Sequence, residues 1–333
     1  MTKKKELKLH PVFGFLLKLA IAVASFYFIY LELFEKRDIE TVFSNISQMI
    51  SGTDWFLLVL TFLMVFDNWG MEAIKWRGVA GILEPTSLLR SYKAVFSGVT
   101  IGMFAPNRIG EFGGKVLWLK PENRAKGVLA AFLTGWAQLL ITLTFGAFSL
   151  TFFLRGNIDW FSQLPTVSYS ILCILALAIP ALLIYIYVNI STKWQFLTKI
   201  GLPKRFIKWV NFLSVFHPAL LASLLLVSLF RYFIFFLQYF ILLYVFDTGI
   251  SFGQLMVLLP VAYVAMSFVP SIFIAEVGVR SSLAIAFLGL VSSNTEGIFA
   301  ASVVIWAMNI AVPAATGAFF ILSHKTRKNK LHD

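Results

Sequence analysis

Two short stretches of this very apolar chain combine charged residues with proline and glycine. They are FAPNRIGEFGGK at 104–115 and FVPSIFIAEVGVR at 268–280. Each begins with phenylalanine, any residue and proline, and each ends with glutamate, any residue, glycine, any residue and a basic residue. A basic side chain can neutralise a phosphate group, and a glutamate can hold an amine or a hydroxyl group or carry a proton. The two motifs therefore predict a shared site for a lipid headgroup.

Six charged side chains are candidates for binding the headgroup. They are Arg108, Glu111, Lys115, Arg231, Glu276 and Arg280. Arg231 is included because it lies well inside the apolar segment 226–240, where an arginine is expected to face a cavity or an acidic partner. Snorkelling of Arg231 towards an interface is the alternative. Asp67 and Glu72 fit either the lining of the cavity or a solvated helix end.

The prolines and glycines of the motifs predict helices that stop and reverse within the membrane. The residues with this structural role are Pro106, Gly110, Gly113, Pro270 and Gly278. Proline lacks an N–H and restrains the residue before it, so it ends the incoming helix, and glycine permits a sharp reversal. A short outgoing helix is expected to begin near each motif glutamate, where its free N–H groups favour an anion such as phosphate. The basic residue lies one turn after the glutamate, on the same helix face.

The composition requires an integral membrane protein. Of the 333 residues, 59% are hydrophobic and 13% are charged, whereas a soluble domain has about 45–50% apolar and about 25% charged residues. The net charge of +12 fits cytoplasmic loops that face anionic lipid, and no nucleic-acid-binding motif accompanies it. The single Cys173 and the four histidines, none of which is in the middle of a span, predict neither a metal site nor a cofactor.

Six segments are long and apolar enough to cross a bilayer, which takes about 20 residues. They are approximately 12–31, 55–73, 127–154, 168–188, 219–246 and 296–322. Two further apolar segments, 88–105 and 251–270, each run into one of the motifs. If both of them dip into the membrane and return, all the clusters of basic residues fall on one side, as the positive-inside rule requires. We therefore predict an all-α, polytopic fold with about six full spans, two re-entrant helical hairpins (6–8 transmembrane helices in all) and both termini in the cytoplasm.

The positions of the motifs also indicate an internal duplication. Glu111 and Glu276 are 165 residues apart, and the second and third spans, shifted by this distance, fall on the fifth and sixth. An odd number of crossings in each half inverts the halves relative to each other, a plan that is common in transporters. Two unrelated glycine-rich loops are the alternative. The predicted single domain covers 1–330, with 12–154 as its first half and 168–322 as its second.

The first motif, written as P-x-R-x-G-E followed by a basic residue, resembles the membrane domain of the lysylphosphatidylglycerol synthase/flippase family, the flippase-like domain of the multiple peptide resistance factor. Residues 106–111 carry this pattern. The second motif matches more loosely, because Ser281 stands where that family has a glutamate and Ala275 and Glu276 replace its glycine pair. The resemblance spans nearly the whole chain and implies a lipid translocator whose two re-entrant elements line a cavity. No synthase domain follows in the sequence, so we expect no aminoacyl-transfer chemistry.

Together these observations favour an integral lipid translocase (flippase) of the cytoplasmic or inner membrane. It would move an anionic phospholipid, or a lipid-linked sugar or aminoacyl lipid, between leaflets through a charged cavity between the two motifs. The alternatives are a membrane-embedded glycosyl or phospho-group transferase with Glu111 or Glu276 as general base, and a non-catalytic membrane partner of another enzyme. We expect membrane lipids as partners, a separate lipid-modifying enzyme as a further candidate partner, and no nucleic acid. The sequence leaves the oligomeric state open.

Overall fold

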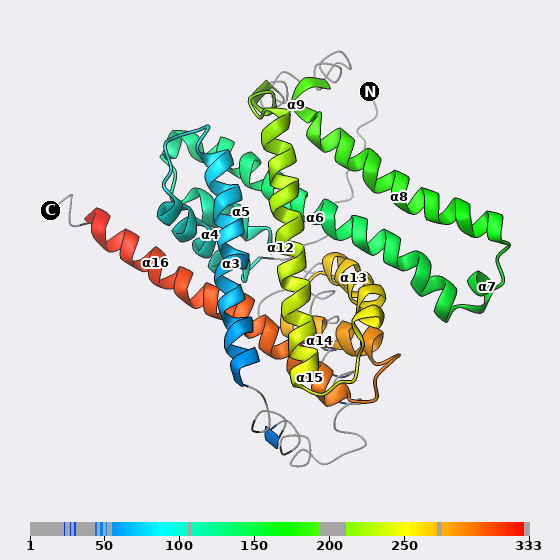
Figure 1. The fold of residues 1–333 in the computed structure, drawn as a ribbon. Helices are drawn as coiled ribbons and strands as arrows, with labels where there is room; N and C mark the ends of the chain where they lie inside the picture. Colours follow the sequence, from blue (N-terminus) through cyan, green and yellow to red (C-terminus); the bar gives the residue numbers. More distant parts are fainter. Residues whose placement is uncertain are drawn as a thin grey trace, which may run out of the picture.

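The computed structural model of the protein describes residues 55–105, 108–193, 211–271 and 275–329, with isolated positions between 23 and 51. All regular secondary structure in these residues is helical, which confirms the predicted all-α class (Figure 1). The first elements are α3 (Trp55–Ala80), α4 (Leu88–Gly102), α5 (Gly110–Val116), α6 (Pro121–Asn157), α7 (Asp159–Ser162), α8 (Thr166–Val188) and α9 (Ile190–Lys193). The later elements are α12 (Pro218–Val245), α13 (Phe252–Phe268), α14 (Ala275–Leu288), α15 (Thr295–Trp306), the π-helical turn η2 (Ala307–Ala311) and α16 (Val312–Asn329).

Five helical segments of the described residues are long and apolar enough to cross a membrane. They are Trp55–Ala80, Pro121–Asn157, Thr166–Val188, Pro218–Val245 and Thr295–Ser323. These segments correspond to five of the six predicted spans, and the remaining one, 12–31, lies almost wholly outside the described residues. Helices α4 and α13 have 15 and 17 residues. At about 1.5 Å per residue they are shorter than the roughly 30 Å hydrocarbon layer, and their re-entry stays a prediction.

Capping residues define the starts of these two short helices. The side chain of Ser87 accepts a hydrogen bond from the Arg90 N–H at the start of α4, and Ser251 and Gln254 form a capping box at the start of α13. Helix α13 ends at Phe268, and the next residue has the extended backbone that precedes a proline. Each short helix then packs against the helix that begins within its motif, α4 against α5 and α13 against α14.

Each short helix packs against a long helix that is distant in the sequence. Helices α3 and α12 lie side by side at the centre (Figure 1), while α4 packs against α16 and α13 packs against α6. Glycine makes both crosswise contacts close: a Cβ on Gly317 of α16 would collide with the Phe96 carbonyl of α4, and one on Gly146 of α6 would collide with Val264 of α13. Each short helix therefore contacts the last long helix of the other predicted half.

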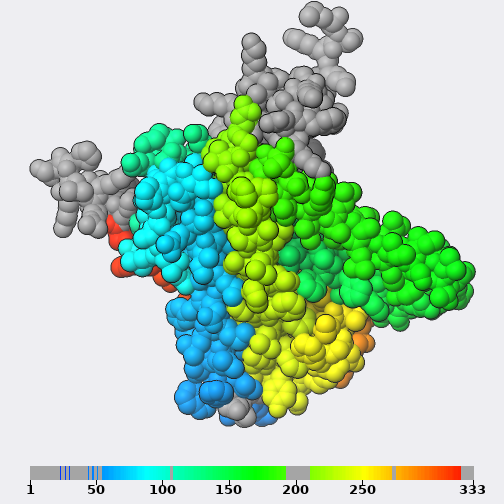
Figure 2. All heavy atoms as spheres, turned by 45° about the horizontal axis from the view of Figure 1, so that its top comes forward, coloured from blue at the N-terminus to red at the C-terminus, as the bar shows by residue number. Residues whose placement is uncertain are grey.

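Helix α8, with the end of α6 and the short α7, forms an arm that projects from the rest of the described residues (Figures 1 and 2). Its most apolar 18-residue window has a mean hydropathy of 2.7, and only 11% of that window is buried inside the protein. A helix that is apolar around its whole circumference and exposed on most sides suits lipid hydrocarbon as its surroundings.

Candidate functional site

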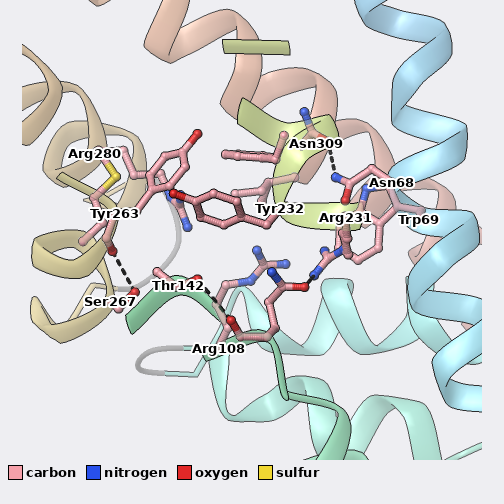
Figure 3. A pocket seen from close by; sticks show the side chains of 14 residues that line it. Asn68, Trp69, Arg108, Thr142, Arg231, Tyr232, Tyr263, Ser267, Arg280 and Asn309 are labelled. Atoms are coloured by element: carbon pink, nitrogen blue, oxygen red, sulfur yellow. Dashed lines mark hydrogen bonds between the residues drawn. The ribbon is translucent and has the colours of Figure 1, made fainter. Parts of the chain in front are cut away.

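A cavity of about 240 Å³ lies among α3, α6, α12, α13, α14 and η2. Three arginines line it: Arg108 in the turn between α4 and α5, Arg231 on α12 and Arg280 on α14. Figure 3 shows the side chains converging from different sides, with Tyr263 and Ser267 on one side of the pocket and the side chains of α3 and η2 on the other. The two motifs therefore contribute cations to one cavity, although they are far apart in the sequence.

Arg108 is held in place by its own motif. Its backbone has φ +58°, a left-handed conformation that is uncommon for a residue with a Cβ and that is found mainly where the surroundings enforce it. Its guanidinium lies 2.6 Å from the carboxylate of Glu111. A Cβ on the intervening Gly110 would lie 2.6 Å from the Ile101 carbonyl oxygen, so α4 and α5 leave room for no side chain there. This tight turn aims Arg108 at the cavity.

Arg280 is positioned by the glutamate one helical turn before it. Its Nε donates a hydrogen bond of 2.9 Å to Glu276 Oε1, and its Nη2 is 2.8 Å from the same oxygen. Glu276 is buried, whereas the side chain of Arg280 is 28% exposed. The glutamate therefore lies behind the arginine, and the arginine presents its remaining N–H groups to the cavity.

Arg231 contacts three groups at the cavity wall. Its guanidinium lies over the ring of Trp69, 5.1 Å from the ring centre, which is a cation–π contact. Its Nη1 donates to Gln138 Oε1 at 3.3 Å and is 3.4 Å from Glu72 Oε2. The mid-span arginine is therefore not directed towards a membrane interface, because α3 and α6 supply partners for it inside the bundle.

Behind this wall lies a buried ionic cluster around Glu72. Its carboxylate is 2.7 Å from Lys115 Nζ and 2.8 Å from Lys75 Nζ, in addition to its contact with Arg231. Lys75 also donates hydrogen bonds to the Thr134 carbonyl at 3.2 Å and to the Ser228 hydroxyl at 3.0 Å, so a single lysine connects α3 to both α6 and α12. Buried charges of this kind are tolerated only when they are paired and hydrogen-bonded.

Buried amide side chains continue the polar wall towards η2. Asn68 donates to Asn309 Oδ1 at 2.7 Å, Asn309 donates to Gln238 Oε1 at 3.3 Å, and Gln238 donates to the Thr61 carbonyl at 2.9 Å. Asn309 lies within the π-helical turn, a deviation from the α-helix that often marks functional positions. The last span therefore contains a π-helical turn whose asparagine faces the cavity.

Among the polar atoms of the wall that have no hydrogen-bond partner among the described residues, three belong to aromatic side chains. They are the hydroxyl groups of Tyr232 and Tyr263 and the indole Nε1 of Trp69. All three side chains are buried and line the cavity. Because buried polar groups are normally satisfied, these atoms are available to a polar group inside the cavity.

The six predicted binding residues occupy three different environments. The three arginines line the cavity, Glu111 and Glu276 each pair with one of these arginines, and Lys115 lies in the Glu72 cluster, outside the lining. Lys115 is 2% exposed, and its ammonium therefore neutralises a carboxylate of the protein instead of reaching a ligand directly.

The glycines and prolines of the motifs also occupy different surroundings. Gly110 is required by a close contact, whereas Gly113 is exposed and a Cβ there would meet nothing within 4 Å. Gly278 is buried in α14, Pro270 follows the end of α13, and Pro106 lies outside the described residues.

Sequence reasoning did not assign a role to Lys75 and left Glu72 undecided. The signal for both was present, because Glu72 and Lys75 are one turn apart in an apolar helix, as expected for a pair that is buried together. Asp67, in contrast, is exposed.

A second group of charges fixes the start of α4 outside the apolar spans. Glu84 accepts from Arg90 at 2.7 Å, from Asn123 at 2.9 Å and from the Lys120 N–H at 3.0 Å. Burial alone would raise the pKa of Glu84, but these hydrogen bonds and the charge of Arg90 outweigh it and hold the pKa below its usual value.

Comparison with known proteins identifies the family of this chain. A family model described as the lysylphosphatidylglycerol synthase TM region matches residues 15–317. A search of curated proteins found no match. The matched region includes both motifs, all three cavity arginines and every helix up to α16. The chain is therefore a membrane protein that belongs to the family of the lysylphosphatidylglycerol synthase TM region.

Proposed function

We propose that this protein is a lipid translocase that moves a lipid with an anionic headgroup between the leaflets of the cytoplasmic or inner membrane. The observation that carries the proposal is the convergence of Arg108, Arg231 and Arg280 on one cavity. Arginines inside a membrane domain are costly, and their presence there favours a functional role in binding or passage of a ligand. Guanidinium groups suit phosphate because they offer several N–H donors in a planar arrangement.

The charge balance around the cavity favours an anion. The cations of the site and of the cluster behind it are Lys75, Arg108, Lys115, Arg231 and Arg280, and the acids that pair with them are Glu72, Glu111 and Glu276. Five cations and three carboxylates leave a formal surplus of two positive charges. A phosphate diester entering the cavity would reduce this surplus, whereas a neutral or cationic molecule would not.

The packing supports movement of two units against each other. The α4–α5 pair contacts the last helix of the chain, and the α13–α14 pair contacts α6, as expected for inverted halves that exchange their short helices. In the proposed cycle the halves rock about the α3–α12 contact, so that the headgroup faces the two leaflets in turn while the acyl chains stay in the bilayer. Both termini lie on the cytoplasmic side in this topology, in agreement with the distribution of basic residues.

Reconstitution tests the proposal directly. The full chain is incorporated into vesicles that contain a panel of fluorescent lipids, and the fraction of label that becomes accessible to an external quencher is followed in time. We expect protein-dependent movement of lipids with an anionic headgroup. Arg280→Ala should lower the rate about tenfold or more, because it removes one of three contacts to the phosphate. Glu276→Gln should also lower it, because it releases the arginine.

Arg77→Ala is the matched control, because Arg77 is an exposed arginine at the end of α3 and its loss changes the net charge by the same amount. It should leave the rate unchanged. Equal rates for Arg280→Ala and Arg77→Ala, or no movement of any lipid by the unmodified protein, would contradict the proposal. Extraction of the lipids after the assay checks their chemistry, and conversion of a labelled lipid would instead favour a transferase.

A further inference from the structure

No carboxylate lines the cavity in the part of the chain that the structure describes. Among the described residues, the side chains that line it are basic, amide, hydroxyl, aromatic or aliphatic. Residues 106–107 and 272–274, which lie within the two motifs but outside the described residues, are proline, asparagine, isoleucine and phenylalanine and include no acid. A site that recognises an ammonium group normally offers a carboxylate or an open aromatic cage.

The described carboxylates that contact the cavity arginines are already engaged. Glu111 pairs with Arg108 at 2.6 Å and Glu276 with Arg280 at 2.8 Å. Glu72 is surrounded by three cations within 3.4 Å. An ammonium group could reach one of these acids only by displacing a basic side chain, and it would remain close to the positive charges of the others. The aromatic face of Trp69 is likewise occupied, by Arg231.

The lining is instead well supplied for hydroxyl groups. The hydroxyls of Tyr232 and Tyr263 lack a hydrogen-bond partner among the described residues, and both side chains are more than nine-tenths buried. The Oδ1 of Asn68 is also buried and accepts no hydrogen bond from the described residues. Tyrosine hydroxyls can both donate to and accept from a polyol, and an amide oxygen accepts from one. The cavity volume of about 240 Å³ is below the roughly 300–1,000 Å³ of drug-sized ligand sites, which suits a headgroup without its acyl chains.

We infer that the headgroup of the proposed translocase is a phosphate that carries an uncharged, hydroxyl-bearing group, and that a headgroup with a primary ammonium is selected against. This inference rests on the proposed function for its biological setting. The three arginines hold the phosphate, and the tyrosine and asparagine groups contact the hydroxyls. An aminoacylated form of the same lipid would bring its ammonium group into a cavity that is already positive.

Competitive binding tests the inference independently of movement between leaflets. The full chain is reconstituted in phosphatidylcholine vesicles with equal trace amounts of phosphatidylglycerol and lysyl-phosphatidylglycerol, then captured, and the lipids that remain bound are measured. We expect phosphatidylglycerol to be retained about tenfold or more over its lysyl derivative, the effect of one unfavourable charge contact. Equal retention, or preference for the lysyl derivative, would overturn the inference. Free glycerol 3-phosphate in a parallel arm shows whether the headgroup competes without its acyl chains.

A carboxylate introduced into the lining should abolish the preference. Thr142 lines the cavity from α6, and its hydroxyl bonds only to the Gln138 carbonyl within the same helix among the described contacts. Thr142→Asp should lower the ratio of phosphatidylglycerol to lysyl-phosphatidylglycerol about tenfold, and the neutral Thr142→Asn should leave it unchanged. An unchanged ratio in a folded Thr142→Asp protein would show that this cavity does not select the headgroup. If that variant does not fold, the ratio of the unmodified protein still decides.

The two proposals fail in different ways. Selective retention of phosphatidylglycerol without movement between leaflets would overturn the translocase and keep the headgroup class. Movement of both lipids at equal rates, with equal retention, would keep the translocase and overturn the headgroup class.

Discussion

Replacement of Glu72 by glutamine gives the strongest test of how the charged core is built. The side chain of Glu72 lies 2.7 Å from Lys115, 2.8 Å from Lys75 and 3.4 Å from Arg231, and among the described residues it is the one carboxylate that contacts all three. Glu72→Gln keeps the shape of the side chain and removes the negative charge. Three cations then remain together in a buried place, where loss of one partner of an ion pair costs about 3–5 kcal/mol.

We therefore expect Glu72→Gln to lower the free energy of unfolding by about 3 kcal/mol or more. The assay is unfolding of the purified protein in detergent, followed by tryptophan fluorescence. Asp67→Asn is the control, because Asp67 lies on the same helix but is exposed, and its effect should stay within about 0.5 kcal/mol. Unfolding of Glu72→Gln at the same midpoint as the unmodified protein would refute the reasoning.

A double substitution tests whether Glu72 and Lys115 depend on each other for stability. Lys115→Met alone removes one cation and leaves the carboxylate with Lys75 and Arg231. Combined with Glu72→Gln, it removes one of the three stranded cations. The double variant should therefore be more stable than the sum of the single effects predicts, by about 1 kcal/mol or more. Simple additivity would show that Glu72 and Lys115 do not depend on each other.

Three further predictions concern packing, the cavity and pH. Gly114→Ala should destabilise the protein by about 1–3 kcal/mol, because its Cβ would lie 2.5 Å from the backbone of α4, whereas Gly113→Ala in the same helix meets nothing within 4 Å and should be neutral in the same unfolding assay. Tyr263→Phe should leave the unfolding midpoint unchanged and weaken retention of phosphatidylglycerol, because the hydroxyl that it removes has no partner among the described residues. The lowered pKa of Glu84 means that its carboxylate stabilises the fold above the pKa of the unfolded chain, and that this contribution is lost as the pH falls through the folded pKa; Glu84→Gln should reduce the acid sensitivity of the unfolding midpoint.

The apolar helices could be predicted from the sequence because burial in lipid depends mainly on length and composition. The segment 55–73 was predicted as a span and lies within α3, and the segment 168–188 nearly coincides with α8. Boundaries were less accurate where polar residues continue a helix. Helix α3 extends to Ala80, seven residues beyond the predicted end, because Glu72 and Lys75 are buried by mutual pairing. A hydropathy scale treats Glu72 and Lys75 as unfavourable in a span, because it takes no account of the ion pair that they form.

The partners of the motif charges could not be predicted, because they depend on helices that are distant in sequence. The four-residue spacing puts each motif glutamate and its basic residue on one helix face, where they could pair or bind a ligand together, and Glu276 does pair with Arg280. In the first motif the left-handed turn at Arg108 brings that arginine to Glu111 instead. Lys115 is then free to reach Glu72 on α3, and neither contact is visible in the local pattern.

The longest ionic contact of the Glu72 cluster is also the one that joins the cluster to the cavity. Glu72, Lys75 and Lys115 all belong to the first predicted half, and their contacts are 2.8 Å or shorter. Arg231 belongs to the second half and lies 3.4 Å from the same carboxylate. An anion in the cavity competes with Glu72 for Arg231, and the two lysines already compensate the carboxylate if Arg231 turns away. In the proposed translocase, binding of the headgroup would weaken a contact between the predicted halves without leaving Glu72 unpaired, which is the coupling that the proposed rocking movement needs.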